Sequence, residues 1–248
     1  MNERSLSTPA AQLPLALRFP PDQRFEAFVA APDGALAQLH ALAHGAGDAG
    51  GAVSSESPGE SASIFIAGPA ATGKTHLLLA ACAQAEAAGR RTAYLPLAAA
   101  AGRLRDALDA IEHADVVALD GLEAVAGSRE DEVALFDAHN RARDAGRSLL
   151  YAARVAPGAL ELVLPDLRSR LSQCARIALE PLDDSGRADV LRLRAQRRGL
   201  QIDDAAIDWL LKRVDRDLGS LTALLDRLDR ESLAAQRRLT VPFLRSVL

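Results

Sequence analysis

The residues with the clearest chemical potential form the octapeptide Gly68-Pro69-Ala70-Ala71-Thr72-Gly73-Lys74-Thr75. It fits the phosphate-loop pattern G-x-x-x-x-G-K-[ST] at every position. In such a loop, successive backbone N–H groups point inward, and the following helix adds the positive end of its dipole. We expect Gly73 to let the backbone approach a phosphate, Lys74 to bridge the β- and γ-phosphates, and the Thr75 hydroxyl to bind Mg²⁺. The sequence therefore predicts a site for ADP or ATP with Mg²⁺.

The predicted contacts to the nucleotide extend slightly beyond this loop. They comprise Gly68, Ala71, Thr72, Gly73, Lys74, Thr75, His76 and Asp120. For His76, which directly follows the loop, an ordinary position in the next helix is the alternative interpretation. Lys74 is informative because the only other lysine of the chain is Lys212, whereas arginines are abundant.

An acidic residue at the end of a second strand would complete such a site. Asp120 ends the apolar run 116–119 and is predicted to order Mg²⁺ together with Thr75. Related ATPases often carry a glutamate at the next position to activate water, but this chain has Gly121 there. We expect Glu123 to point elsewhere. The sequence thus predicts nucleotide binding with weak or absent hydrolysis by the chain itself.

The elements that must position these residues alternate along the chain from residue 63. Short β-type runs alternate with stretches of helical periodicity, so we predict an α/β fold with a parallel five-stranded sheet covered by helices on both faces. After Pro181 the pattern is helical only. We therefore expect a flexible tail over 1–24, a nucleotide-binding domain over 25–181 and a small helical lid domain over 182–248. Residues 45–62 lack large apolar side chains except Val53 and are predicted to form a surface loop.

Composition excludes several classes of protein. Hydrophobic residues make up 49% and charged residues 25%, and no apolar run reaches the length of about 20 residues that a membrane-spanning helix needs. No secretory signal is visible, so we expect a cytoplasmic protein. Cys82 and Cys174 are predicted to be reduced core thiols. The net charge of −4 argues against binding DNA mainly through bulk positive charge.

From Gln12 to Leu248 the chain resembles the AAA+ proteins, and more narrowly the DnaA-related Hda family, regulatory inactivators of the bacterial replication initiator DnaA. The supporting segments are 12–17, 68–78, 94–97, 125–127, 164–171, 181–184 and 235–243. The terminal segments are more specific than the phosphate loop. The resemblance implies that DnaA is a partner and that a bacterial cytoplasm is the location.

The resemblance also implies roles for two further segments. Gln12-Leu13-Pro14-Leu15-Ala16-Leu17 is similar to the family's motif for binding the DNA polymerase III sliding clamp (β subunit), with Gln12, Leu13, Leu15 and Leu17 as the contacts. DNA would then be reached only through the clamp. Packing of this segment on its own domain is the alternative.

Arg170 matches the family's arginine finger, which would act on ATP bound to a partner, while Arg168 could share this role or form a salt bridge. The family's usual polar sensor positions are occupied here by Ala152 and Ala153 and, in the lid, by Gly219. In the segment that would frame the adenine, Phe25 and Phe28 are kept.

Two other functions remain open from the sequence. One is a DnaA-like initiator or helicase-loading AAA+ protein, which would carry a DNA-reading domain; we see none after the predicted lid. The other is a free-standing P-loop ATPase, which would need a catalytic carboxylate beside Asp120. Whether the chain forms a homo-oligomer is not predicted.

Overall fold

The computed structural model describes residues 22–29, 31–45, 62–213, 218–235 and 238–247. The proposed clamp-binding segment 12–17, and most of the predicted surface loop 45–62, lie outside these ranges. None of the described helices is long and apolar enough to cross a membrane.

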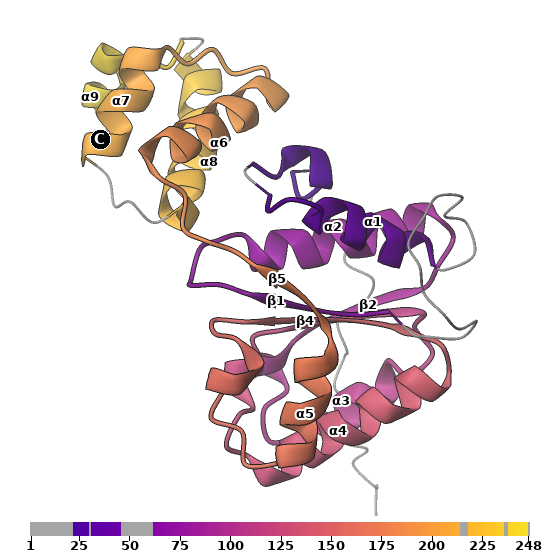
Figure 1. The fold of residues 1–248 in the computed structure, drawn as a ribbon. Coiled ribbons are helices and arrows are strands. Elements are labelled where there is room, and N and C mark those ends of the chain that lie inside the picture. The colour runs from indigo at the N-terminus through magenta and orange to yellow at the C-terminus, as the bar shows by residue number, and fades with distance from the viewer. Residues whose placement is uncertain (1–21, 30, 46–61, 214–217, 236–237, 248) are drawn as a thin grey trace, which may run out of the picture.

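A parallel five-stranded sheet lies at the centre of the first domain, as predicted (Figure 1). Its strands are β1 (Ser63–Ala67), β2 (Thr92–Pro96), β3 (Val116–Asp120), β4 (Ser148–Ala153) and β5 (Ala175–Ala178). Their order across the sheet is β2-β3-β4-β1-β5. Because all strands are parallel, the phosphate loop after β1 and Asp120 at the end of β3 lie at the same carboxyl edge, with only β4 between their strands.

Helices cover both faces of this sheet (Figure 1). One face carries α1 (Ala35–His44) and α2 (Lys74–Ala87), and the other carries α3 (Leu104–Ala110), α4 (Arg129–Asp144) and α5 (Pro165–Gln173). Alternate strand residues supply the two cores: Ile64 and Ile66 pack on the α1 and α2 side, and Phe65 packs on the opposite side. The period of two in a pleated strand explains this division.

Within the described ranges, four short 3₁₀ helices, which we did not predict, shape the connections. They are η1 (Phe25–Ala27), η2 (Leu97–Ala99), η3 (Leu122–Ala124) and η4 (Pro157–Ala159). Gly121, which precedes η3, has φ +82°, a value that favours glycine. The chain therefore turns sharply just after Asp120.

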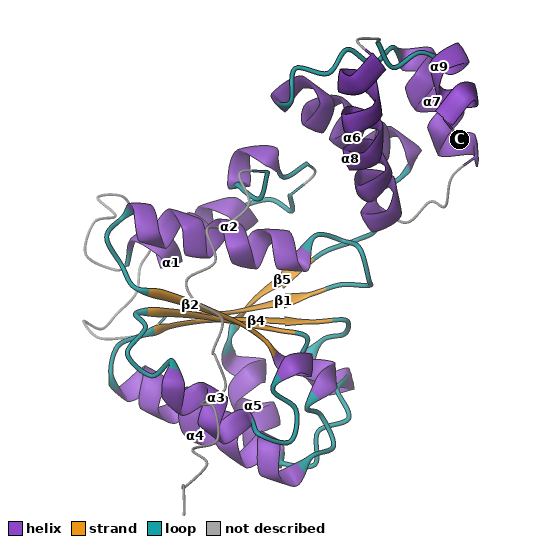
Figure 2. Ribbon diagram, turned by 180° about the vertical axis from the view of Figure 1, so that it is seen from behind, coloured by secondary structure: helices purple, strands orange, loops and turns teal. Residues whose placement is uncertain are grey.

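The C-terminal helices form a separate cluster beside the α1 and α2 layer (Figure 2). They are α6 (Asp184–Arg197), α7 (Asp204–Arg213), α8 (Leu218–Ala235) and α9 (Val241–Val247). Asp183 caps α6 through its side chain, which accepts a 2.7 Å hydrogen bond from the Gly186 N–H. Leu191, Leu225 and Leu244 are fully buried in the centre of this cluster.

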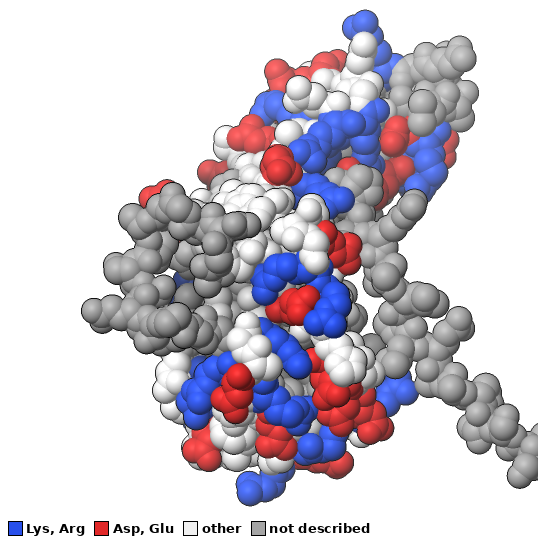
Figure 3. Space-filling view, turned by 90° about the vertical axis from the view of Figure 1, so that its right-hand side faces the viewer, with Lys and Arg blue, Asp and Glu red and all other residues white. Residues whose placement is uncertain are grey.

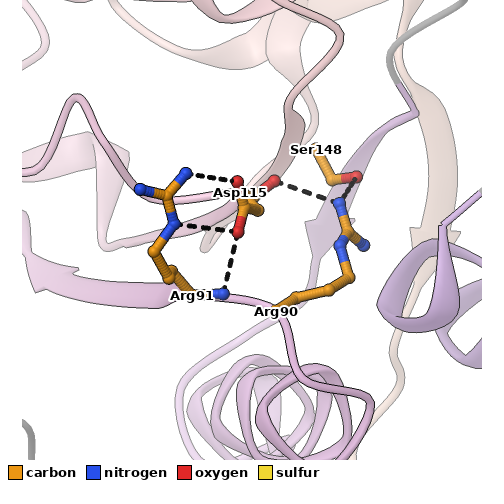
Figure 4. Close-up of polar contacts among 4 residues, drawn as sticks. All are labelled: Arg90, Arg91, Asp115 and Ser148. Carbon is orange, nitrogen blue, oxygen red and sulfur yellow. Dashed lines mark hydrogen bonds and ion pairs between the residues drawn. The ribbon is translucent and has the colours of Figure 1, made fainter.

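Arg90 ties together the amino edge of the sheet, opposite to the phosphate loop (Figure 4). Its guanidinium donates to the Asp115 carbonyl and to the Ser148 hydroxyl, both at 3.1 Å, and to carbonyls at the end of α1. The Asp115 carboxylate accepts hydrogen bonds from the Arg91 side chain and backbone. These bonds lower the pKa of Asp115 to about 2.

Both cysteines are buried and unpaired, as expected. Burial raises the pKa of Cys82 to about 12 and that of Cys174 to about 11, so both thiols are protonated at neutral pH. On the face shown in Figure 3, basic and acidic side chains are interspersed over the α/β domain. Over this domain, the visible part of the face therefore has no extended area that is basic alone.

Candidate functional site

The phosphate loop connects β1 to α2 at the carboxyl edge of the sheet. Gly68 donates from its N–H to the Ala153 carbonyl of β4 at 3.2 Å, and a Cβ atom at Gly68 would lie 2.6 Å from the Leu179 carbonyl oxygen. Gly73 has φ +93°, and a Cβ atom there would lie 2.6 Å from the Phe28 ring. Ala71 also has a positive φ of 61°, which costs a non-glycine residue about 1–3 kcal/mol. Packing on both sides therefore determines the shape of the loop.

Lys74 is buried at the start of α2, with its ammonium inside the loop. Nζ donates to the carbonyl oxygens of Gly68 and Pro69, each at 2.6 Å. Burial lowers the pKa of Lys74, and the charges of Glu123 and Asp120 raise it. Lys74 therefore lies against the backbone that would surround a phosphate, and the charges of two carboxylates act on it.

Asp120 and Thr75 come together across the mouth of the loop. The Thr75 hydroxyl donates to Asp120 Oδ2 at 2.6 Å, and the Tyr94 hydroxyl donates to the same oxygen at 2.9 Å. Tyr94 was not among our predicted site residues. It lies on β2 on the same face of the sheet as Asp120, but only the pairing of β2 with β3 brings the two side chains together. Burial and Asp120 raise the pKa of Tyr94, so its hydroxyl remains a donor.

These residues fit a nucleotide with its magnesium ion. Mg²⁺ prefers six oxygen ligands and usually takes several of them from phosphates and water. Thr75 and Asp120 offer two oxygens beside the loop, and Lys74 adds the positive charge that phosphates need. Within the described part of the chain, no group of three His, Cys, Asp or Glu side chains could hold a metal by itself. The arrangement suits an ion that arrives with a nucleotide.

His76 anchors the N-terminal segment above the loop. Its Nε2 lies 2.8 Å from the Arg24 carbonyl, and its ring meets that of Phe28 edge to face at a centroid distance of 5.4 Å. Burial lowers the pKa of His76, which favours the neutral ring. Phe25 packs against His40 in the core instead. Direct contact of His76 with a nucleotide stays a prediction, and its visible partner is the chain itself.

Glu123 does not point away from the site, which corrects our expectation. Among the charges around Lys74, that of Glu123 acts more strongly than that of Asp120. The Glu123 carboxylate pairs with Arg154, which directly follows β4. The strand ends with the buried Ala152 and Ala153, but the next residue is charged. Sequence reasoning missed Arg154 because arginines are frequent in this chain.

Arg170 lies in the last turn of α5, on the opposite face of the sheet from α2. No hydrogen-bond acceptor or carboxylate within the described ranges pairs with its half-buried guanidinium. Arg168 differs, because its Nη2 donates to the Leu162 carbonyl at 2.5 Å. Arg168 therefore holds the segment before α5, whereas the Arg170 side chain is free to meet another molecule.

A buried carboxylate holds the segment that leads into α5. Glu132 on α4 is fully buried and accepts hydrogen bonds from the backbone N–H groups of Gly127 (2.8 Å), Val163 (3.0 Å) and Leu164 (2.7 Å). It thus joins the turn after η3 to the two residues before α5. We did not single out Glu132 from the sequence, because its burial arises only when α4 and α5 pack together.

The lid contacts the N-terminal segment through charged side chains. Arg198, just after α6, pairs with Asp22 and with Asp226 on α8, each at 2.5 Å. Burial lowers the pKa of the neighbouring Arg194, while Asp22 and Asp226 raise it. Gly219, the predicted equivalent of a lid sensor arginine, is exposed on α8. Arg194 and Arg197 on α6 are close enough to His76 for their charges to lower its pKa.

The lid and the whole fold resemble known replication proteins. Residues 184–248 match the family described as the lid domain of Hda. The fold matches domain III of the replication initiation protein DnaA from Thermotoga maritima, with a TM-score of 0.71 and 22% identity over 90% of this chain and 94% of that one. It also matches AMPPCP-bound DnaA from Aquifex aeolicus, with a TM-score of 0.63 and 22% identity over 88% of this chain and 71% of that one.

A more distant match extends the comparison to another AAA+ protein. The RuvB Holliday junction branch migration motor of Thermotoga maritima gives a TM-score of 0.56 at 17% identity, over 75% of this chain and 60% of that one. The sheet order, the phosphate loop and the helical lid agree with the resemblance drawn from the sequence. The chain thus has the AAA+ fold seen in domain III of DnaA, and its residues 184–248 are similar to the lid domain of Hda.

Proposed function

We propose that this protein is a negative regulator of chromosomal replication initiation in the bacterial cytoplasm. Through residues 12–17 it binds the DNA-loaded sliding clamp. It then presents Arg170 to ATP on DnaA and promotes hydrolysis of that ATP. Its own site, from Gly68 to Thr75 with His76 and Asp120, holds ADP or ATP with Mg²⁺. The tail, the nucleotide-binding domain and the lid would divide at about residues 24 and 181.

One observation carries the proposed action on a partner. Arg170 is a half-buried arginine without a described acidic partner. It lies on α5, and the segment that leads into this helix is held by hydrogen bonds to Glu132 and Arg168. Arg170 has no described partner and lies away from this chain's own phosphate loop. Its guanidinium is therefore suited to bind a phosphate on another protein. An arginine finger of this kind stabilises the charge that develops on the transferred phosphoryl group.

In this proposal, the nucleotide in the chain's own site supports the folding of this chain and its assembly with a partner, and the hydrolysed ATP is the one on DnaA. Lys74, Thr75 and Asp120 are placed to bind phosphates and Mg²⁺. The solved structure of a DnaA protein with AMPPCP bound shows that the same fold accommodates an adenine nucleotide analogue. Gly121 leaves no carboxylate directly after Asp120, so we expect slow hydrolysis by this chain.

The proposed arginine finger is tested by hydrolysis of ATP on purified DnaA in the presence of DNA-loaded clamp. Arg170→Ala should lower the stimulated rate by about 10³-fold or more, which is the usual contribution of such a residue. Arg176→Ala is the matched control, because Arg176 is exposed and bonds only to the Ser172 carbonyl of the same segment. Full stimulation by Arg170→Ala would refute the assignment.

Clamp binding is tested separately by retention on immobilised clamp. The triple variant Gln12→Ala/Leu15→Ala/Leu17→Ala should lose retention, since the apolar side chains would fill a pocket on the clamp. Arg170→Ala should be retained like the wild type. Equal retention of the triple variant and the wild type would exclude this docking segment.

A further inference from the structure

We propose that Tyr94 positions Asp120 for magnesium: its hydroxyl fixes one oxygen of the carboxylate and thereby leaves the other for the ion and its bound water. This inference rests on the proposed binding of an adenine nucleotide with Mg²⁺ by Gly68–Thr75. It adds a positioning residue from β2, a strand that contributed no residue to the site predicted from the sequence.

The two carboxylate oxygens of Asp120 are used differently. Oδ2 accepts the Thr75 hydroxyl at 2.6 Å and the Tyr94 hydroxyl at 2.9 Å. Among the residues that the structure describes, none donates a hydrogen bond to Oδ1. The carboxylate therefore keeps one oxygen, with its lone pairs, for a cation or for water bound to that cation.

The single proton of the Thr75 hydroxyl makes the orientation of Asp120 important. When a threonine of this type binds Mg²⁺, a lone pair of its oxygen faces the cation, and its proton needs an acceptor on another side. Asp120 Oδ2 is that acceptor in the structure. Rotation of the carboxylate would remove the acceptor, so the orientation of Asp120 controls both oxygens that the chain offers to the ion.

Tyr94 can hold this orientation because its own ring is held by the sheet. Pro96, two residues after Tyr94 on β2, pairs with Asp120 on β3, so the side chains of Tyr94 and Asp120 lie on the same face. The partly buried ring packs against the core beneath α1 and α2. Burial, followed by the charge of Asp120, raises the pKa of Tyr94, so the phenol keeps the proton that it donates.

Two effects of the Tyr94 hydroxyl on a bound cation oppose each other. The donated hydrogen bond withdraws negative charge from Asp120, which weakens the attraction for Mg²⁺. The same bond keeps the carboxylate in one orientation, and a site that is competent only part of the time binds more weakly by that fraction. We expect the second effect to be larger, because Mg²⁺ keeps several of its waters and these screen the charge of Asp120.

The test compares the affinity of the purified full chain for ADP in excess Mg²⁺ and in EDTA, measured by titration calorimetry. Tyr94→Phe keeps the ring and removes only the donor. Free rotation would leave the competent orientation of Asp120 populated about a third to a tenth of the time, so the gain in affinity from Mg²⁺ should fall about three- to tenfold. The affinity in EDTA should change less than about twofold, whereas a merely structural role of Tyr94 would lower both affinities alike.

Tyr151→Phe is the matched control, because Tyr94 and Tyr151 are the only tyrosines of the chain. The Tyr151 hydroxyl lies 2.8 Å from His139 Nδ1, and its ring packs in the core on the opposite face of the sheet. This variant should keep the full gain from Mg²⁺. In an Asp120→Ala background, Tyr94→Phe should have no further effect on the gain, since the carboxylate that it positions is absent.

A second measurement uses the unaltered chain. With ¹³C-labelled tyrosine, Tyr94 and Tyr151 give two NMR signals, which the Tyr151→Phe variant assigns. Mn²⁺ added with ADP in place of Mg²⁺ should broaden the Tyr94 signal much more than the Tyr151 signal.

The inference alone would be overturned by equal broadening of the two signals. It would also be overturned by a Tyr94→Phe variant that keeps the full gain from Mg²⁺ or loses affinity equally in Mg²⁺ and in EDTA. A wild-type chain whose affinity for ADP does not rise with Mg²⁺ would instead overturn the proposed magnesium site, and the inference with it.

Discussion

Replacement of Glu132 should lower both the stability of the α/β domain and the proposed action of Arg170. This carboxylate is fully buried and accepts three backbone N–H groups from two segments that are distant in sequence. A hydrogen bond to a charged group contributes about 1.5–3 kcal/mol, and removal of one partner of a buried charged interaction costs about 3–5 kcal/mol. We expect Glu132→Ala to lower the free energy of unfolding by about 4 kcal/mol.

Glu132→Gln offers a finer measurement at nearly constant volume. Its amide oxygen can accept the hydrogen bonds of Gly127 and Val163, but its NH₂ group would then face the Leu164 N–H. One unsatisfied buried donor costs about 1–3 kcal/mol, so we expect a loss of about 2 kcal/mol. The free energy of unfolding should therefore be lower for Glu132→Ala than for Glu132→Gln.

Urea unfolding followed by far-UV circular dichroism measures these differences. Glu130→Gln is the control, because it removes an exposed carboxylate from the same first turn of α4 and loses at most about 1 kcal/mol of helix-dipole energy. Under conditions where Glu132→Gln is folded, its stimulation of ATP hydrolysis on DnaA should also fall, since the segment before α5 is loosened. A loss below 1 kcal/mol for Glu132→Ala would refute this account of the contact.

Further predictions concern the loop, the core and the lid. Gly73→Ala should destabilise the fold by about 1–3 kcal/mol and weaken nucleotide binding, because its Cβ would strike the Phe28 ring. Gly146 also has a positive φ but lies in open space, so Gly146→Ala should lower the free energy of unfolding by less in the same urea titration. Burial and neighbouring arginines lower the pKa of His139 to about 4, while the Tyr151 hydroxyl lies 2.8 Å from its Nδ1. In the unfolded state the pKa of His139 is near 6.5, so between pH 6.5 and pH 4 the unfolded state binds more protons than the folded state. The free energy of unfolding should therefore fall by about 2 kcal/mol from pH 7 to pH 5. His139→Phe should lose that part of the pH dependence. Arg198→Ala leaves Asp22 and Asp226 without their partner and should speed amide hydrogen exchange in residues 22–29 and α6; exchange as slow as in the wild type would contradict a role for Arg198 in holding the lid.

The sequence by itself determined the elements and the phosphate loop. The alternation of short β-type runs with helical stretches predicted a parallel five-stranded sheet followed by a helical domain, and the structure has both. Gly68–Thr75 was recognised because a phosphate loop depends on consecutive residues, whose types reflect local backbone geometry. Asp120 followed from the same logic, since the carboxyl ends of parallel strands meet at one edge of the sheet.

Only the tertiary structure decided which distant side chains complete the site. Tyr94 meets Asp120 because β2 pairs with β3, and Glu123 meets Arg154 because the turn at Gly121 brings η3 beside the end of β4. Neither pair has a characteristic spacing in the sequence. The sequence left open whether Arg168 shares the role of Arg170 or forms a salt bridge, and in the structure the Arg168 guanidinium bonds to the Leu162 carbonyl. Contacts across a sheet depend on strand order and burial, and these are properties of the folded chain as a whole.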